Sequence, residues 1–289
     1  MYCYQLRNMG CPPDIPVCVR DTYQAHSSVL HEHDYLEIAV IRLGYGEHII
    51  HGDEGRELKS SVIKGDVFTI LDGERHYYRM CENFRVYNIC VGWSYFERFR
   101  RELEPLRYFA DFLAPNREFG INMLHLPPVV FSDAEAVIMK LRQALAAPVP
   151  SRSLAVQIAF LELLYTLFEN GTSGLKRSPY CLDDRLFKSI AAMEERPEQR
   201  FSVAKAARES SMSVSGFAHK FKDAVGVPPT EYCILLRLEK CKQLLERSDR
   251  SIEEIAITGG FCDGNYMGRL FRRRYGMTPH DYRKIFRGT

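Results

Sequence analysis

The sequence predicts an α+β protein of two domains: an N-terminal β-barrel with a helical extension, followed by an all-α domain. Three observations predict this organisation. Residues 15–92 contain short apolar and β-branched runs separated by glycine and aspartate, which is typical of strands. Residues 131–170 have helical periodicity, and residues 182–289 contain an internal repeat of helical segments. The length of 289 residues also suits two domains better than one.

The barrel is expected within residues 1–130. Four runs are expected to be strands: 36–43, 47–50, 66–71 and 84–91. The turn signals between them are Gly44, Gly46, Gly52-Asp53, Gly65-Asp66 and Asp72-Gly73. Many short strands at this spacing are typical of a small sandwich or barrel. Both alternating faces of residues 36–43 are apolar, with Glu37 on the face of Ala39 and Ile41, so the sheet is expected to be covered on both sides.

Two helices are expected to follow, within residues 131–170. The first covers 132–147, with Ser132 as its N-cap and Glu135 at the spacing of a capping box. The second covers 151–169. One apolar stripe runs along it through Leu154, Ile158, Leu161, Tyr165 and Phe168. Two interpretations stay open: the stripe packs on the barrel, or it forms a dimerisation surface. Residues 171–181 are rich in Gly, Ser and Pro and are expected to be a linker.

The C-terminal part, residues 182–289, contains a duplication. Residues 201–232 align with 250–282 at an offset of 49 residues, which becomes 50 after one extra residue in the second copy. The matched pairs are Ser202 and Ser251, Val203 and Ile252, Ala207 and Ala256, Phe221 and Phe271, Gly226 and Gly276, Pro229 and Pro279, and Tyr232 and Tyr282. Each copy has a short helix, a polar turn and a second helix that begins at a capping residue, Ser213 or Asp263, which is the pattern of a helix-turn-helix unit.

The helices of the two copies have expected inner and outer faces. Residues 231–247 should form one continuous helix between the copies. The side chains expected in the core are Phe217 and Phe221 in the first copy, and Tyr266, Leu270 and Phe271 in the second. The charge distribution indicates a polyanionic partner for this part: residues 181–289 have a net charge of +5, whereas residues 1–180 have −3.

The second copy carries specific motifs. They are A-x3-G-F from Ala256, then D-x-N-Y-M-x-R-L-F from Asp263, then G-M-T-P-x-D-Y-R from Gly276. In these motifs the chain resembles the AraC-type (arabinose regulator) family of bacterial transcription regulators over about 100 residues. The resemblance implies two helix-turn-helix units that read successive major-groove segments of double-stranded DNA, with RNA polymerase and a second copy of the chain as further partners.

By position, the resemblance assigns the residues at the DNA. The base-facing residues would be Ser215, Gly216 and His219 in the first copy and Gly264, Asn265 and Arg269 in the second. Residues that would contact phosphate are Lys220, Lys222, Arg272, Arg273 and Arg274. Each interior glycine costs a helix about 1 kcal/mol relative to alanine. Because Gly216, Gly264 and Gly268 lie in the expected recognition helices, we expect weak DNA binding by the monomer, strengthened by dimerisation.

The N-terminal part contains His31, His33 and Glu37 at H-x-H-x3-E-x6-G spacing, and His76 follows a glycine turn downstream. This pattern resembles the two motifs of the cupin barrel, in which such side chains converge. Three interpretations stay open. The residues His31, His33, Glu37, His76 and Tyr78 bind a small-molecule effector without metal; or His31, His33, Glu37 and His76 bind Ni, Zn, Mn or Fe; or they form a hydrogen-bonded cluster without a ligand. The segment from His31 to Gly55 is similar to sensors of sugar-responsive regulators of the rhamnose type, which implies a sugar.

These features predict a transcription regulator, an activator rather than an enzyme, whose DNA binding is controlled by a small molecule. The alternatives are a metal-dependent cupin enzyme with a DNA-binding tail and a repressor without an effector. The nine cysteines are scattered and form no CxxC, which does not suggest a disulfide framework or a zinc ribbon. We identify no signal peptide and no membrane-spanning run, and we expect a cytoplasmic protein.

Overall fold

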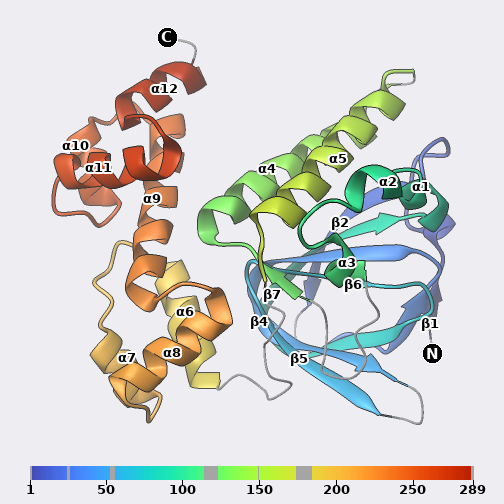
Figure 1. The fold of residues 1–289 in the computed structure, drawn as a ribbon, viewed down its shortest axis with the longest axis horizontal. Coiled ribbons are helices and arrows are strands. Elements are labelled where there is room, and N and C mark those ends of the chain that lie inside the picture. Colours follow the sequence, from blue (N-terminus) through green and yellow to red (C-terminus); the bar gives the residue numbers. More distant parts are fainter. Residues whose placement is uncertain are drawn as a thin grey trace. The chain divides into compact units, whose positions relative to one another are not determined.

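The computed structural model describes residues 2–24, 27–52, 56–113, 123–148, 150–173 and 184–287. The chain forms two compact units, one mainly Met1–Leu182 and the other mainly Asp183–Thr289 (Figure 1). The first unit is strand-rich and the second is helical, so the predicted α+β organisation is confirmed. Most of the expected linker, 171–181, lies outside the described residues.

The first unit is built on one curved sheet of half-barrel shape (Figure 1). Its strands are β1 (Tyr2–Tyr4), β2 (Val17–Gln24), β3 (His31–His33), β4 (Leu36–His51), β5 (Glu57–Ile63), β6 (Asp66–Ile70), β7 (Arg75–Val91), β8 (Met123–His125) and β9 (Thr172–Ser173). Strand β4 is central, because it pairs antiparallel with β5, β6 and β7. Strand β7 also pairs with β2 and β3, which brings residues from distant parts of the sequence side by side.

Two of the expected turns are bulges instead. Gly44 and Gly46 do not end a strand: the expected strands 36–43 and 47–50 are one strand of 16 residues, β4. The pairing of β4 with β7 shifts register between Ile41 and Glu47, and Gly44 takes a φ of +75° there. A glycine with positive φ lets a strand bend through a bulge without ending. Gly65 and Gly73, with φ of +88° and +75°, do lie in turns between strands, as predicted.

The two faces of β4 are both buried, as its sequence predicts. Leu36, Ile38 and Val40 belong to a core shared with the helices, whereas Ala39 and Ile41 belong to a separate core on the inner side of the sheet. The helices of this unit are the short η1 (Leu6–Asn8), α1 (Trp93–Glu97), α2 (Arg100–Leu103), α3 (Phe109–Leu113), α4 (Pro128–Leu145) and α5 (Arg152–Asn170). Helices α4 and α5 lie side by side over the outer face (Figure 1).

The expected start of the first long helix is wrong. Helix α4 begins at Pro128, four residues before Ser132, so Ser132 lies within the helix and is not its N-cap. Proline is favoured at the first helical position, because its fixed φ fits the helix and its missing N–H would have no partner there. The Glu135 carboxylate accepts hydrogen bonds from Arg42 Nε (3.1 Å) and the Tyr87 hydroxyl (2.8 Å), so it is not part of a capping box.

The apolar stripe of α5 divides into two parts. Phe168 is fully buried and Leu161 is half-buried against the core, so these two pack on the sheet side. Leu154, Ile158 and Tyr165 are 64%, 58% and 57% exposed, so packing on the half-barrel is wrong for them. The core-facing side of α5 is formed by neighbours at other positions: Val156, Ala159, Phe160, Leu163, Leu164 and Leu167.

The second unit consists of helices only. They are α6 (Asp184–Glu195), α7 (Val203–Glu209), α8 (Val214–Val225), α9 (Pro229–Arg247), α10 (Ile252–Thr258), α11 (Gly264–Tyr275) and α12 (Pro279–Arg287). Helices α7 and α8 form one helix-turn-helix unit, α10 and α11 form the other, and α9 is the expected continuous helix between them. No helix in the described ranges has the length and apolarity that crossing a membrane requires.

Equivalent residues of the duplication have equivalent structural roles. The side chains of Ser202 and Ser251 cap α7 and α10. The hydroxyls of Tyr232 and Tyr282 each donate a 2.6 Å hydrogen bond to a glutamate of an earlier helix, Glu194 in α6 and Glu246 in α9. The repeat is therefore visible in the contacts of the folded chain as well as in its sequence.

The turns of the two helix-turn-helix units show where the two copies of the duplication differ in length. Ser211 and Gly260 are equivalent and both have positive φ, +54° and +88°. The next residue of each copy donates its N–H to the carbonyl of the equivalent alanine of the first helix: Met212 to Ala207 and Phe261 to Ala256. The extra residue of the second copy is therefore Cys262, which lies between this turn and Asp263.

Candidate nucleic-acid interface and buried polar site

Helix α8 has one buried and one exposed face. Phe217 and Phe221 are fully buried, as predicted, and their rings lie 5.9 Å apart. Ser213 caps the helix, since its Oγ accepts the N–H of Gly216 at 3.0 Å. The predicted DNA-contacting residues are on the opposite side: Ser215, His219, Lys220 and Lys222 are exposed, and Gly216 is half-buried.

Helix α11 has the same arrangement. Asp263 caps it by accepting the Tyr266 N–H at 2.6 Å. Met267 and Phe271 are fully buried, whereas Tyr266 and Leu270, which were expected in the core, are only half-buried. Met267 was missed, although it aligns with Phe217 in the duplication, and that alignment is the signal that would have identified it. The exposed side of α11 carries Asn265, Arg269, Arg272, Arg273 and Arg274.

Only one of the three glycines, Gly268, lies in the interior of a recognition helix. Gly264 is the first residue of α11 and not an interior one, and its N–H donates to Glu253 Oε2 at 2.8 Å. Gly216 is in the first turn of α8, where N–H groups have no partner within the helix. Gly268 is interior, and an added Cβ would have no atom within 4 Å. The cost of about 1 kcal/mol per interior glycine therefore applies to Gly268.

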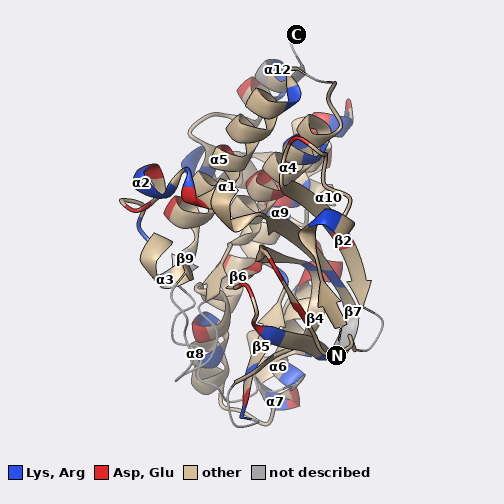
Figure 2. Ribbon diagram, turned by 90° about the vertical axis from the view of Figure 1, so that its right-hand side faces the viewer, with Lys and Arg blue, Asp and Glu red and all other residues tan. Residues whose placement is uncertain are grey.

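The two helices differ in charge. Helix α11 contains four arginines and no acidic residue, whereas α8 contains Lys220, Lys222 and Asp223. Figure 2 shows Lys and Arg as well as Asp and Glu scattered over the described residues. Of the four helices of the helix-turn-helix units, α7, α8 and α10 each contain an acidic residue, whereas α11 contains none. A helix with this charge suits the phosphate-lined major groove.

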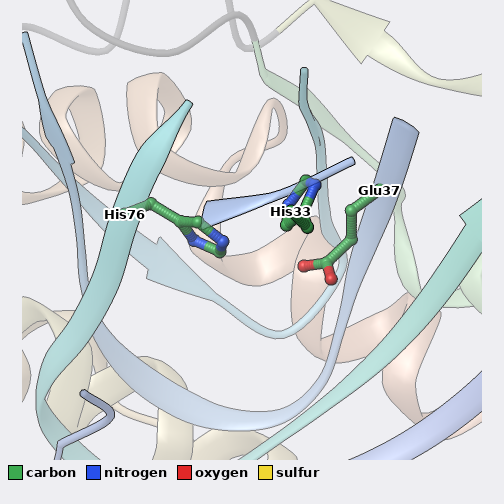
Figure 3. Close-up of side chains that lie close together, drawn as sticks. All are labelled: His33, Glu37 and His76. Carbon is green, nitrogen blue, oxygen red and sulfur yellow. The ribbon is translucent and has the colours of Figure 1, made fainter. Parts of the chain in front are cut away.

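The first unit contains a buried polar cluster made by His33 of β3, Glu37 of β4 and His76 of β7 (Figure 3). One potential ligand atom of each residue lies within 4.8 Å of those of the other two. The three residues are 1%, 2% and 0% exposed. They come from separate strands, and the pairing of β7 with both β3 and β4 holds them together.

Hydrogen bonds orient the two histidines of the cluster. His33 Nδ1 lies 2.8 Å from the carbonyl oxygen of Tyr35, which can only accept, so this nitrogen carries the proton. His76 Nδ1 lies 3.0 Å from Nε2 of His48, which is itself fully buried. Each residue of the cluster has one buried atom without a hydrogen-bond partner in the described part of the chain: His33 Nε2, Glu37 Oε1 and His76 Nε2. His48 Nδ1, beside the cluster, has none either.

Two predicted residues of this site lie beside the cluster. His31 is half-buried, its Nδ1 is 2.8 Å from the Val29 carbonyl, and its ring is 4.2 Å from that of His76. It does not belong to the group of converging atoms. Tyr78 is buried, with its ring 4.9 Å from His48 and 6.1 Å from His76. The residue that the sequence interpretation missed is His48.

Burial dominates the ionisation of the cluster. It lowers the pKa of His33 to about 4 and that of His48 to about 3, and it lowers the pKa of His76 well below its ordinary value. The pKa of Glu37 is raised to about 7, also by burial. At neutral pH the three imidazoles are therefore uncharged and keep a lone pair on one nitrogen.

The comparisons with known proteins give consistent matches. A helix-turn-helix domain family matches residues 206–285. The chain is 28% identical over 258 residues to the HTH-type transcriptional activator RhaS of Escherichia fergusonii, a match that covers 88% of the chain and 87% of the relative. It is 27% identical over 259 residues to the activator of the same name in Klebsiella pneumoniae, with the same coverage. Among solved structures, 36% of the chain is similar to 95% of the DNA-binding domain of AdpA, a global transcriptional factor in complex with a target DNA, at 31% identity and a TM-score of 0.35.

The helix-turn-helix match and the two relatives, which align along most of the chain, define the class: the chain is a DNA-binding transcription regulator. The helix-turn-helix match, over residues 206–285, lies within the part of the chain where the duplication predicted two such units.

Proposed function

We propose that the chain is a cytoplasmic transcription activator and not an enzyme, and that a small molecule bound at the His33–Glu37–His76 cluster controls its action at DNA. The observation that carries this proposal is the cluster itself. It places three buried polar atoms without partners beside the apolar inner core of the half-barrel, in a chain whose other unit contains a helix-turn-helix domain. A sugar is the class of effector that we propose, because neighbouring hydroxyls can donate hydrogen bonds to such atoms.

At the DNA, we propose separate roles for side chains that specify and side chains that position. Asn265 and Arg269 lie in the N-terminal half of α11 and would contact base edges, as would Ser215, Gly216, His219 and Gly264 through their side chains or backbone. Lys220, Lys222, Arg272 and Arg273 would contact phosphate. Their exposure, opposite the buried faces of α8 and α11, supports this division.

We further propose that the protein acts as a homodimer that contacts RNA polymerase. Leu154, Ile158 and Tyr165 form an exposed apolar stripe on α5, opposite the side that packs on the sheet. Apolar stripes of this kind mark interaction surfaces, and a second copy presents the same stripe in a two-fold arrangement. Two linked DNA-binding units would bind a double site more tightly than one.

The experiment is a thermal-shift screen of the full chain with sugars and small organic acids. A ligand that binds the folded state at 100 times its Kd stabilises that state by about 2.7 kcal/mol, which raises the melting temperature. The same ligand should change the affinity for promoter DNA, and Glu37→Gln should abolish both effects while His51→Gln, outside the cluster, keeps them.

The alternatives give different outcomes. A cupin enzyme would convert the ligand that stabilises it, and a repressor without an effector would show no ligand-dependent change. If the chain is a repressor, deleting its gene should raise transcription from the promoter that it binds. Such a rise would contradict the proposal that the chain is an activator.

A further inference from the structure

We propose that a pocket between α6, α7 and α9 binds a small phosphorylated molecule that carries at least two negative charges. The pocket has a volume of about 400 Å³, and all of its lining residues belong to the helical unit (Figure 1). The His33–Glu37–His76 cluster belongs to the other unit. The inference therefore does not depend on the effector proposed for that cluster.

The first argument is the charge of the pocket lining. Five of the lining residues are basic and one, Glu209, is acidic. The basic residues come from α6, from the loop that follows it and from α7, and they are Arg185, Lys188, Arg196, Arg200 and Lys205. A hollow lined by charges of one sign concentrates counter-ions of the other sign. Guanidinium and ammonium groups are also the side-chain groups that bind phosphate oxygens most strongly.

The second argument is the shape and the floor of the pocket. Met193 and Ala206 line it and are each 3% exposed, and the half-buried Cys233 of α9 lines it as well. Sites for small molecules have volumes of about 300–1,000 Å³ and combine apolar walls with a few polar groups. A ligand with a carbon body fits such a floor, and its phosphate group, with up to two negative charges and three acceptor oxygens, fits the basic residues around it.

The third argument is that the loop of the pocket, residues 196–202, is held in place before any ligand binds. Arg237 of α9 donates hydrogen bonds to two carbonyls of this loop, Pro197 (2.8 Å) and Gln199 (2.9 Å). Lys240, one turn further along α9, pairs with Glu198 at 2.7 Å. The backbone that carries the two arginines of the loop is therefore already ordered, which lowers the entropy cost of binding.

The fourth argument is a comparison with the second copy of the duplication. Lys205 aligns with Glu254, and the equivalent hollow beside α10 has one basic lining residue, Arg250, and two acidic ones, Glu253 and Glu254. A basic lining is therefore not a requirement of the helix-turn-helix fold. It also does not follow the charge of the recognition helices, since α11 of the second copy is the more basic one. This difference favours a small ligand of the first copy over a DNA-backbone contact shared by both copies.

The test is isothermal titration calorimetry of the full chain at about 0.15 M salt, where long-range charge effects are screened. The probes are phosphoenolpyruvate, pyruvate, which has the same three-carbon body without the phosphate, and malate, which has two carboxylates and no phosphate. We expect saturable binding of one phosphoenolpyruvate per chain. Pyruvate and malate should bind at least about 10-fold more weakly, because they lack the charge-assisted hydrogen bonds of the phosphate oxygens.

Variants of exposed residues locate the bound probe. Arg200→Ala and Lys205→Ala should each weaken the binding of phosphoenolpyruvate by about 10-fold, as loss of one hydrogen bond between charged groups does. Arg208→Ala is the matched control: it removes the same charge from an exposed position of α7 that does not line the pocket, and it should keep the wild-type affinity. Circular dichroism shows that each variant is folded.

A second measurement separates a small ligand from the DNA backbone. Without phosphoenolpyruvate, Arg200→Ala and Lys205→Ala should bind DNA no more weakly than Arg208→Ala, with the salt dependence of the wild-type chain. If instead both variants bound DNA more weakly than this control and lost about one ion of salt dependence, the two residues would be assigned to DNA phosphates and the inference would fail.

Three calorimetric results would also overturn the inference. The first is the absence of saturable phosphoenolpyruvate binding to the folded wild-type chain. The second is an equal affinity for malate or pyruvate, which would exclude selection of a phosphate group. The third is an equal loss of affinity in Arg208→Ala, which would show that the probe responds to the general charge of α7 and not to the pocket.

Discussion

Arg269 and Arg272 are exposed arginines one turn apart on α11, but we expect different contributions from them. Arg269 is in the sixth position of the helix, and its guanidinium lies 5.9 Å from the centroid of the Tyr266 ring, which restricts its orientation. Arg269→Ala should weaken binding to the preferred DNA by about 1–3 kcal/mol and relax the preference at one base pair. Fluorescence anisotropy with DNA selected from a random pool, and with single-base variants of it, measures both effects.

Arg272→Ala should behave differently in the same assay. Loss of a phosphate contact weakens binding to all sequences equally and reduces the salt dependence by about one ion. Lys140→Ala is the control, because it removes one positive charge from α4, outside the helix-turn-helix domain. If Arg269→Ala lowered the affinity for all DNA sequences equally, without any change in base preference, the assignment of Arg269 to base contacts would be contradicted.

Single residues of the buried site differ in how far the sequence reveals them. The resemblance to the cupin motifs implied that His33, Glu37 and His76 converge together with His31. The first three do, and His31 lies beside them. His48 was not predictable from alternation, since counting from Glu37 along β4 places even-numbered residues on the outer face. The register shifts between Ile41 and Glu47 change this parity, so that His48 faces inward and stacks on Phe68 at 4.7 Å. A bulge depends on pairing with another strand, which local sequence does not encode.

At the level of elements, two glycines of the second helix-turn-helix unit should respond oppositely to alanine. Gly268→Ala should stabilise the chain by about 1 kcal/mol, because the site is helical and an added Cβ meets open space. Gly260→Ala should destabilise it by about 1–3 kcal/mol, because the φ is +88° and the Cβ would lie 2.6 Å from Glu198 Cα. Urea unfolding of the full chain, followed by circular dichroism, gives both values. An unchanged urea midpoint for Gly268→Ala would show that Gly268 does not lower the stability of α11. The cost of this glycine would then not explain weak DNA binding by the monomer.

Helices were easier to predict than strands for a physical reason. In the second unit the starts of α7, α9, α10 and α11 are marked by a local residue, which is Ser202, Ser251, Asp263 or a proline, so these start positions follow from capping chemistry. In the first unit, the length of β4 depends on partners up to 55 residues away, such as Val91 opposite Leu36, and Gly44 therefore appeared as a turn. The start of α4 was mistaken because Ser132 and Glu135 have the spacing of a capping box but bind elsewhere.

At the scale of the whole molecule, α5 carries an exposed apolar surface that packing within its own unit does not explain. The periodicity of α5 predicted an apolar stripe, but not which of its residues face the sheet, because that depends on how α5 packs beside α4. Once the structure assigns Phe168 to the core, Leu154, Ile158 and Tyr165 remain exposed to solvent. Exposed apolar side chains this close together have a cost in a monomer that a partner surface would remove.

Leu154→Glu combined with Ile158→Glu should therefore separate the proposed dimer into monomers and lower DNA affinity together. Two like charges placed opposite their copies repel across a two-fold interface, whereas the buried side of α5, with Phe160 and Leu164, is untouched. Analytical ultracentrifugation measures the oligomeric state, and anisotropy measures binding to DNA with one or two half-sites. We expect a 10²–10⁴-fold loss of affinity for the double site, on the order of the gain from linking two modules, and little change in affinity for the single site.

Ile257→Glu, a similar change at an exposed position of α10, should leave the oligomeric state unchanged. A double variant that stays dimeric would place the interface elsewhere, and a monomeric wild-type chain with full affinity for the double site would exclude dimerisation as the source of that affinity.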